Sequence, residues 1–216
     1  MEPKFWKEKW AANEIQFHCG VPNEHLVAYF SKLPPQRVVV PLCGKSLDMA
    51  WLHKQGHEVM GFELSPLACE AFFQENALPF QKTALGQGEL FQGDRIALWC
   101  GDIFQSPLPL WDKTQSIYDR AALVALPAAL RKRYAAFLAE RLKAPSRYLL
   151  LTYEYQSDRE LGPPFSVPAG EVNDLFASSF AIRHLQSGVS QELSRRAGKF
   201  EKTDVTEHVF ELTKLG

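Results

Sequence analysis

The sequence predicts an α/β fold, with a mostly parallel sheet, helices on both faces and an antiparallel strand at one edge. Short runs of β-branched and aromatic residues alternate along the chain with longer segments of helical periodicity. The first of these short runs are apolar without alternation, which is typical of strands buried on both faces of a parallel sheet. The alternating run at residues 206–212 indicates an edge strand.

Two helices are predicted ahead of the sheet. Residues 3–13 place Trp6 and Trp10 on one helical face. Residues 23–32 form the second helix, because Asn23 can cap its start and two consecutive prolines stop it.

The repeating order of strand, turn and helix begins after those prolines. A valine-rich strand at residues 37–41 is followed by a glycine turn and a helix over 46–55. A second strand is predicted over residues 58–63, and a second helix starts at Ser65. This order is that of a parallel α/β unit.

The later elements continue the pattern. We expect strands at 95–100, 116–118, 147–155 and 180–185, and helices at 127–142 and 169–177. Residues 79–94 contain several Gly and Gln residues and predict either a hairpin or a loop. Because no repeat or long linker divides the chain, we expect residues 1–216 to form a single domain.

Composition excludes several classes of partner. The 24 Lys and Arg residues balance 25 Asp and Glu residues, so we expect no nucleic-acid partner. No segment has the apolar length of a signal peptide core or a membrane span, so we expect a cytoplasmic protein with no membrane partner.

Cysteine and histidine spacing predicts neither a disulfide framework nor a metal site. The four cysteines form no C-x-x-C pair, and we expect reduced, mostly buried thiols. The histidines at positions 18, 53, 57 and 208 have no ligand spacing, so we expect hydrogen-bonded or solvated side chains.

Ligand-binding candidates lie in the turns that follow the strands, because ligands of open α/β sheets bind beyond the strands' carboxyl ends. Gly44 lets a ligand approach the backbone just before a helix starts. A phosphate loop would need glycine in place of Val39, and the G-x-G-x-x-G fingerprint is absent. The ligand is therefore expected to lack a pyrophosphate, which counts against a nucleotide-dependent oxidoreductase.

The next turns supply charged residues. Glu63 ends the second strand, about 20 residues after the glycine turn, where an acidic side chain binds ribose hydroxyls; a solvated loop carboxylate is the alternative. Asp102 and Ile103 follow the third strand and suit an adenine ring, although Asp102 equally suits a helix cap. Arg120 follows Asp119 after the fourth strand and is expected to point into the same crevice.

Five ordered blocks of sequence resemble a known family, the thiopurine S-methyltransferases, which are class I S-adenosylmethionine-dependent methyltransferases. The order and approximate spacing of the blocks match the family from near the amino terminus to about residue 176. The blocks are Phe5-Trp6-x-x-x-Trp10 with Phe17-His18, Pro41-Leu42-Cys43-Gly44-Lys45, Gly56-His57 with Glu63-Leu64-Ser65, Asp119-Arg120-x-Ala122-Leu123, and Gly162-Pro163-Pro164-Phe165.

The resemblance implies a Rossmann-like, seven-stranded sheet that binds S-adenosylmethionine and releases S-adenosylhomocysteine. The cofactor residues it implies are Trp10, Leu42, Glu63 and Arg120, with Gly44 in the same turn as Leu42 and the Asp102–Ile103 turn beside the adenine.

On the acceptor side, the resemblance implies a helical lid at residues 1–33 and an acceptor pocket lined by Phe17, Pro163 and Pro164. Arg195 or Arg196 is the candidate for a late acceptor-side arginine.

The implied reaction methylates the sulfur of an aromatic or heterocyclic thiol, in a detoxifying role that extends to selenium or tellurium compounds. An aromatic thiol ionises near neutral pH, so we assign no general base and take Asp119 and Arg120 as candidates for positioning an anionic acceptor. The alternative is a protein that binds S-adenosylmethionine without thiol methyltransferase activity. We expect a monomer.

Overall fold

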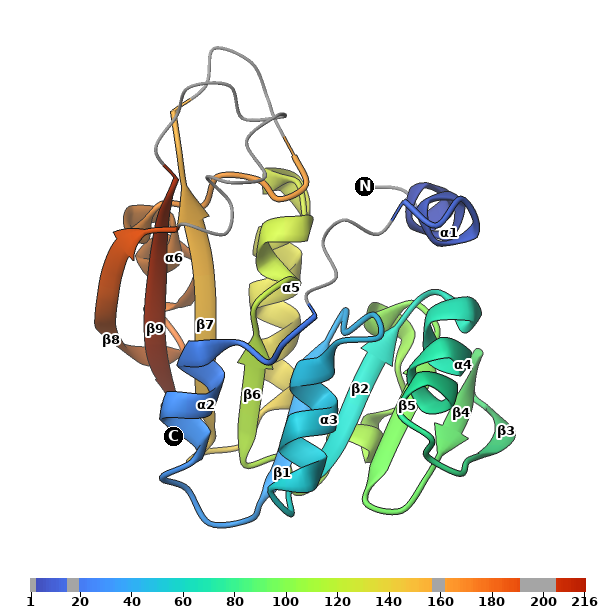
Figure 1. Ribbon diagram of the computed structural model, residues 1–216. Helices are drawn as coiled ribbons and strands as arrows, with labels where there is room; N and C mark the ends of the chain where they lie inside the picture. Colours follow the sequence, from blue (N-terminus) through green and yellow to red (C-terminus); the bar gives the residue numbers. More distant parts are fainter. Residues whose placement is uncertain (1–2, 15–19, 157–161, 191–204) are drawn as a thin grey trace. The chain divides into compact units, whose positions relative to one another are not determined.

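The computed structural model describes residues 3–14, 20–156, 162–190 and 205–216 (Figure 1). The chain forms two compact units, Met1–Tyr118 and Asp119–Gly216. The described residues contain nine strands, whereas the resemblance implies seven.

The first unit holds a sheet with the strand order β3-β4-β5-β2-β1-β6. Its helices and strands are α1 (Pro3–Ala11), α2 (Glu24–Phe30), β1 (Arg37–Pro41), α3 (Leu47–Lys54), β2 (Glu58–Glu63), α4 (Pro66–Glu75), β3 (Gln81–Leu85), β4 (Gly88–Gln92), β5 (Ile96–Cys100) and β6 (Ser116–Asp119). Two 3₁₀ helices, η1 (Ile103–Gln105) and η2 (Leu108–Trp111), connect β5 to β6.

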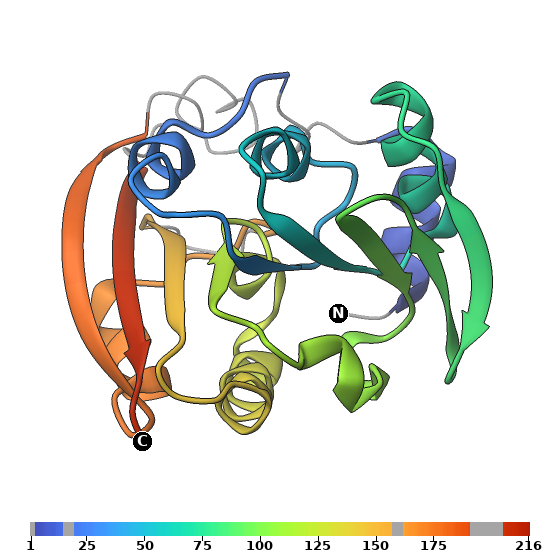
Figure 2. The ribbon, with the colours of Figure 1, turned by 90° about the horizontal axis from the view of Figure 1, so that it is seen from below.

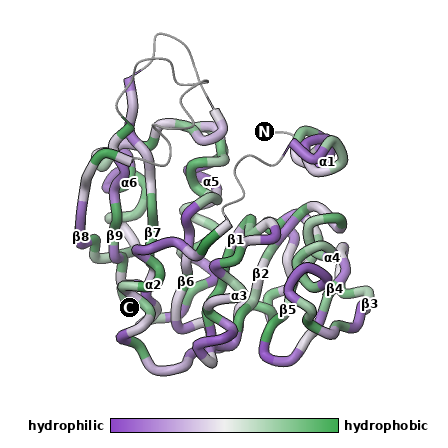
Figure 3. Tube along the Cα trace, in the orientation of Figure 1, coloured by the Kyte–Doolittle hydropathy of each residue, from purple (hydrophilic) through white to green (hydrophobic). Residues whose placement is uncertain are grey.

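The centre of this sheet is parallel, as predicted. β1 pairs with β2 and β6, and β2 pairs with β5, all in parallel register. The strands β2 and β5 are buried almost throughout, and the valine run of β1 is coloured hydrophobic in Figure 3. A β-branched run without alternation therefore did mark a strand covered on both faces.

Helical segments cover both faces of the first unit's sheet. On one face, a Cβ added at Gly61 would lie 3.1 Å from the sulfur of Met49 in α3, so helix and strand pack closely there (Figure 2). On the other face, Phe62 stacks on Trp111 of η2 with ring centroids 4.5 Å apart. The predicted layering is confirmed.

The segment at residues 79–94 forms a hairpin, one of its two predicted alternatives. β3 and β4 are antiparallel, and β4 also pairs with β5 in antiparallel register. This hairpin accounts for the two strands beyond the implied seven.

The described part of the second unit contains three antiparallel strands in the order β7-β9-β8, with two α-helices. Its elements are η3 (Leu123–Ala125), α5 (Ala128–Arg141), β7 (Arg147–Glu154), α6 (Ala169–Phe176), β8 (Phe180–Val189) and β9 (Thr206–Lys214). Tyr148 of β7 packs edge-on against Phe176 of α6 with centroids 5.6 Å apart, so α6 covers one face of these strands.

The predicted edge strand at residues 206–212 is wrong in its position. β9 lies between β7 and β8, and β8 is the edge (Figure 1). Alternation reports that the two faces of a strand differ in burial, not that one of its edges is free. The largely exposed β8 is the strand left at the edge.

Candidate functional site

The turn between β1 and α3 has an unusual backbone. Leu42 has φ 47° and Gly44 has φ 54°, both in the left-handed region. For a leucine this conformation costs about 1–2 kcal/mol, and such strain gathers at ligand-binding turns. Among the bonds that hold the turn, the Cys43 N–H donates to the Phe62 carbonyl over 2.9 Å, and the Asp48 N–H donates to the Ser46 hydroxyl over 3.1 Å.

Trp10 of α1 lies against Gly44. A Cβ added at Gly44 would be 3.1 Å from the nearest carbon of the Trp10 ring, tighter than an ordinary contact. Trp10 itself is 9% exposed. The first unit therefore brings together two of the predicted cofactor residues from segments far apart in the sequence.

Glu63 is a buried carboxylate at the end of β2, with 7% exposure, so the solvated alternative is excluded. Its Oε2 accepts the N–H of Gly44 over 2.8 Å, and its Oε1 accepts those of Leu64 and Ser65, each over 2.8 Å. Burial raises the pKa of this carboxyl above its usual value, while the three N–H donors favour the ionised form. Glu63 thus ties the turn after β1 to the turn after β2.

Asp102 and Ile103 follow β5, the neighbour of β2. The Asp102 carboxylate accepts the N–H of Phe104 over 3.1 Å and so caps η1, which is the alternative foreseen for it. Ile103 is buried, and the Gly101 N–H donates to the Glu63 carbonyl over 2.8 Å. Because β1, β2 and β5 are parallel neighbours, their three turns lie at one edge of the sheet.

Asp119 and Arg120 belong to the second unit. Asp119 is 1% exposed and accepts four hydrogen bonds: from the N–H groups of Ala122 (2.8 Å) and Leu123 (3.2 Å), and from the hydroxyls of Tyr134 and Tyr148 (2.8 Å each). Burial raises its pKa above the usual range, against those four donors. Arg120 follows it directly and is half-buried.

Pro163 and Pro164 lie in a segment of the second unit that several bonds hold in place. The Pro164 carbonyl accepts the Tyr155 hydroxyl over 2.8 Å, and the Phe165 N–H donates to the Val124 carbonyl over 2.7 Å. Both prolines are half-buried, and the bonds preceding them are cis. Phe17, Arg195 and Arg196 lie outside the described residues.

Sequence reasoning missed two buried polar networks. Asp48 of α3 is 1% exposed and accepts the Asn23 N–H over 2.7 Å and the Tyr118 hydroxyl over 3.0 Å, which ties α2 to the sheet. The second network surrounds Arg131, a 4% exposed arginine of α5. The signal for Arg131 was its place on the helix stripe shared with Tyr134 and Leu138.

Cysteine and histidine environments follow the predictions where they are described. Cys43, Cys69 and Cys100 are buried free thiols, and burial raises the pKa of Cys43 well above its usual value. His53 contacts the Asp94 carbonyl over 2.9 Å, and His57 accepts the Gln36 N–H over 3.2 Å.

Within the described ranges, no group of three or more His, Cys, Asp or Glu side chains is arranged to hold a metal ion. Among the helices of those same ranges, none has the length and apolar character needed to cross a membrane.

Two solved structures with a similar fold are methyltransferases that contain bound S-adenosylhomocysteine. The Synechocystis PCC 6803 magnesium protoporphyrin IX methyltransferase aligns with TM-score 0.67 and 13% identity over 99% of this chain and 100% of its own. The Burkholderia thailandensis 1,6-didemethyltoxoflavin-N1-methyltransferase aligns with TM-score 0.64 and 16% identity over 99% of this chain and 87% of its own. This chain shares its fold with these two proteins.

The family follows from sequence. The thiopurine S-methyltransferase family profile matches residues 1–215. The thiopurine S-methyltransferase of Pseudomonas entomophila is 42% identical over 99% of this chain and all of its own length. That of Aliivibrio fischeri is 46% identical over 86% of this chain and 87% of its own. The chain belongs to the thiopurine S-methyltransferase family.

Proposed function

We propose that this chain transfers the methyl group of S-adenosylmethionine to the sulfur of an aromatic or heterocyclic thiol. The carrying observation is the buried Glu63 carboxylate bonded to the Gly44 N–H, with Trp10 packed over the same glycine. Membership of the family, and relatives named for this activity, support the choice of acceptor.

The residues at this edge fit the cofactor. An ionised carboxylate has about four acceptor positions, and Glu63 uses three of them, so Oε2 keeps one for a ribose hydroxyl. Gly44 leaves room for the Trp10 ring, where a side chain would be in the way. Leu42, two residues before the glycine and with a strained φ of 47°, is proposed to contact the cofactor. Asp102 and Ile103 are proposed for the adenine end.

Bound S-adenosylmethionine supplies an already activated methyl group. The protein's work is then to hold a thiolate in line with it, at about 3–3.5 Å. Trp10 adds an aromatic face for a sulfonium cation, an interaction worth about 0.5–2 kcal/mol. No general base is needed for a thiol that ionises near neutral pH.

We assign Asp119 and Arg120 different roles on the acceptor side. The four donors on Asp119 suit a group that holds the turn after β6, and Arg120 is the cation carried by that turn. Arg120 is proposed to bind the cofactor and to steady an anionic acceptor.

The proposal places both compact units in one catalytic domain. Residues 1–33 act as a lid, and Phe17, Pro163 and Pro164 line the acceptor pocket. The protein is proposed to act as a cytoplasmic monomer, with selenium or tellurium compounds as further acceptors in detoxification.

The test is a calorimetric titration with S-adenosylmethionine, followed by 6-mercaptopurine with S-adenosylhomocysteine release monitored. Binding with product formation is the expected result. Binding without turnover on 6-mercaptopurine, thiophenol and selenite would replace the proposal with a protein that binds the cofactor without catalysis. Absence of cofactor binding would overturn the site itself.

A further inference from the structure

Arg131 is a buried cation in the middle of the second unit. It is 4% exposed and shares the inward stripe of α5 with Tyr134, Ala135 and Leu138. Burying a guanidinium is unfavourable unless it is paired and hydrogen-bonded, so its partners show what it organises.

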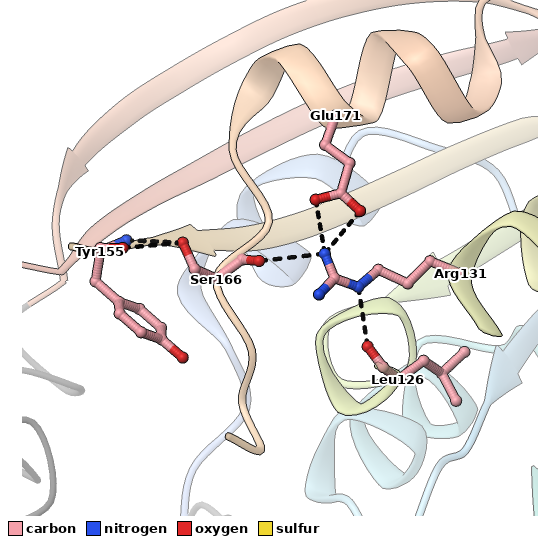
Figure 4. A network of polar contacts seen from close by, with 5 residues as sticks. All are labelled: Leu126, Arg131, Tyr155, Ser166 and Glu171. Carbon is pink, nitrogen blue, oxygen red and sulfur yellow. Dashed lines mark hydrogen bonds and ion pairs between the residues drawn. The ribbon is translucent and has the colours of Figure 1, made fainter. Parts of the chain in front are cut away.

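The partners of Arg131 come from three separate segments (Figure 4). Its Nε donates to the Leu126 carbonyl over 2.9 Å, ahead of α5. Its Nη1 donates to the Ser166 carbonyl over 3.2 Å and to both carboxylate oxygens of Glu171 in α6 over 2.7 Å. The guanidinium carbon also lies 5.9 Å from the ring centroid of Phe165. A single side chain thus joins α5, α6 and the segment at residues 162–168.

That segment has a second set of bonds to the end of β7. The Ser166 hydroxyl bonds both the N–H and the carbonyl of Tyr155 over 3.1 Å, and the Val167 N–H donates to the Tyr153 carbonyl over 2.7 Å. Ser166 is therefore held from two sides, by Tyr155 through its side chain and by Arg131 through its carbonyl. Pro163 and Pro164 immediately precede this doubly held stretch.

We propose that Arg131, held in place by Glu171, is a positioning residue that sets the place of the Pro163–Pro164 segment and so governs acceptor affinity and selectivity. This inference rests on the proposed function, in which those prolines line the acceptor pocket. Arg131 contacts neither the cofactor nor the acceptor in this scheme.

The geometry predicts which substitution matters more. Arg131→Lys keeps the charge, but one ammonium cannot reach the Leu126 carbonyl, the Ser166 carbonyl and Glu171 together. Glu171→Gln keeps an acceptor oxygen and leaves the Ser166 and Leu126 bonds in place. Arg131→Lys is therefore expected to shift the segment more than Glu171→Gln.

The experiment compares wild type, Arg131→Lys and Glu171→Gln with 6-mercaptopurine and with the smaller thiophenol. Misplacing groups that position a substrate can cost up to about 100-fold, so we expect Arg131→Lys to raise the KM for 6-mercaptopurine about 10-fold. Glu171→Gln should raise it about 3-fold, on the same basis. The ratio of kcat/KM values should move toward thiophenol, and the dissociation constant of S-adenosylmethionine should stay within about 2-fold of wild type.

The matched control is Arg183→Lys, in the exposed ion pair of Arg183 with Glu211 on β8 and β9. It changes the same residue type in the same unit and should leave both KM values unchanged. A purely structural loss would lower the active fraction, which reduces kcat for both acceptors and leaves KM and selectivity as they were.

Two negative outcomes can be told apart. Suppose that wild type turns over thiols. If Arg131→Lys then keeps the wild-type acceptor KM and selectivity, or loses as much affinity for the cofactor as for the acceptor, this inference is overturned and the proposed function stands. If wild type binds S-adenosylmethionine but methylates neither thiol, both fail. Should Arg131→Lys not fold, the KM and selectivity of Glu171→Gln decide.

Discussion

Glu63→Gln tests the buried carboxylate that joins the first two turns. In wild type, one oxygen accepts a single N–H, from Gly44, and the other accepts two, from Leu64 and Ser65. A glutamine offers one oxygen and one NH₂ group. Whichever way it is oriented, the NH₂ group faces at least one buried N–H donor, so at least one hydrogen bond is lost.

The size of the effect follows from that count. Leaving one buried donor unsatisfied costs about 1–3 kcal/mol. Removing a buried charge offsets part of this, because burial disfavours the ionised form of Glu63. We therefore expect a loss of about 1–2 kcal/mol in the free energy of unfolding. For a chain of this length that lowers Tm by about 2–8 °C.

Cofactor affinity should fall as well. The amide lacks the charge that strengthens a bond from a ribose hydroxyl, and charge-assisted bonds contribute about 1.5–3 kcal/mol. That range corresponds to an increase of about 10- to 150-fold in the dissociation constant of S-adenosylmethionine.

Thermal unfolding and calorimetric titration measure the two effects separately. The control is Glu58→Gln on the same strand, where Glu58 is exposed and pairs with Arg37. Surface pairs contribute about 0–1 kcal/mol, so this variant should change Tm by little and cofactor affinity not at all. An unchanged Tm for Glu63→Gln would refute the hydrogen-bond count, and an unchanged dissociation constant would refute the ribose contact.

Three further predictions concern the same two units. Cofactor affinity should weaken on acidification, and it should do so at a higher pH than it would with an ordinary glutamate. The reason is that burial raises the pKa of Glu63 above its usual value of 4.5, and the ionised form is the acceptor. Titrations from pH 7 to 4.5 check this, and Glu63→Gln should abolish the pH dependence. Gly44→Ala should lower the free energy of unfolding by about 1–2 kcal/mol, since its φ of 54° is unfavourable for alanine and the added Cβ meets Trp10. Denaturant unfolding of the double variant Gly44→Ala with Trp10→Ala separates these two causes. If backbone strain alone is responsible, Trp10→Ala restores none of the lost stability. Asp119→Asn should lower Tm by about 2–8 °C through a loss of about 1–2 kcal/mol, because NH₂ replaces one of two oxygens that each accept two hydrogen bonds. Burial raises the pKa of Asp119 above 3.8, so protonation of this carboxyl stabilises the fold, and that stability is lost as pH rises through the raised pKa. The Tm difference between wild type and Asp119→Asn should therefore widen as pH falls toward 3.8.

The parallel centre of the fold could be predicted from the sequence because its signals are local. β1 and β2 match their predicted ranges at both ends, since each is an apolar run bounded by turn residues. The place of β9 between β7 and β8 could not be predicted. Strand order depends on pairing between segments far apart in the chain, and the face pattern of a strand carries no information about its neighbours.

The candidate site, like the fold, could be predicted from the sequence only where its signals are local. The spacing from Gly44 to Glu63 is local to one strand-turn-helix-strand unit, so sequence reasoning found the pair that the structure joins by a 2.8 Å bond. Arg131 was missed because its partner Glu171 lies in another helix, 40 residues later. Its position on an apolar helix stripe marks a buried charge, but only the fold identifies what the charge holds.

Glu63 and Asp119 show how sequence and structure together assign roles to two similar carboxylates. Both were predicted as site residues, and both are buried carboxylates that end a strand and accept N–H bonds from the next turn. Asp119 has four protein donors for about four acceptor positions, whereas Glu63 has three and is the more exposed of the two, at 7% against 1%. The number of protein donors on each carboxylate favours Glu63 as the one that contacts a ligand and Asp119 as the one that holds neighbouring residues in place. We therefore expect the two variants to separate: Glu63→Gln weakens cofactor binding beyond its effect on Tm, while Asp119→Asn lowers Tm with a dissociation constant for S-adenosylmethionine within about 3-fold of wild type, a difference of about 0.6 kcal/mol. A larger loss of cofactor affinity in Asp119→Asn than in Glu63→Gln would reverse this assignment.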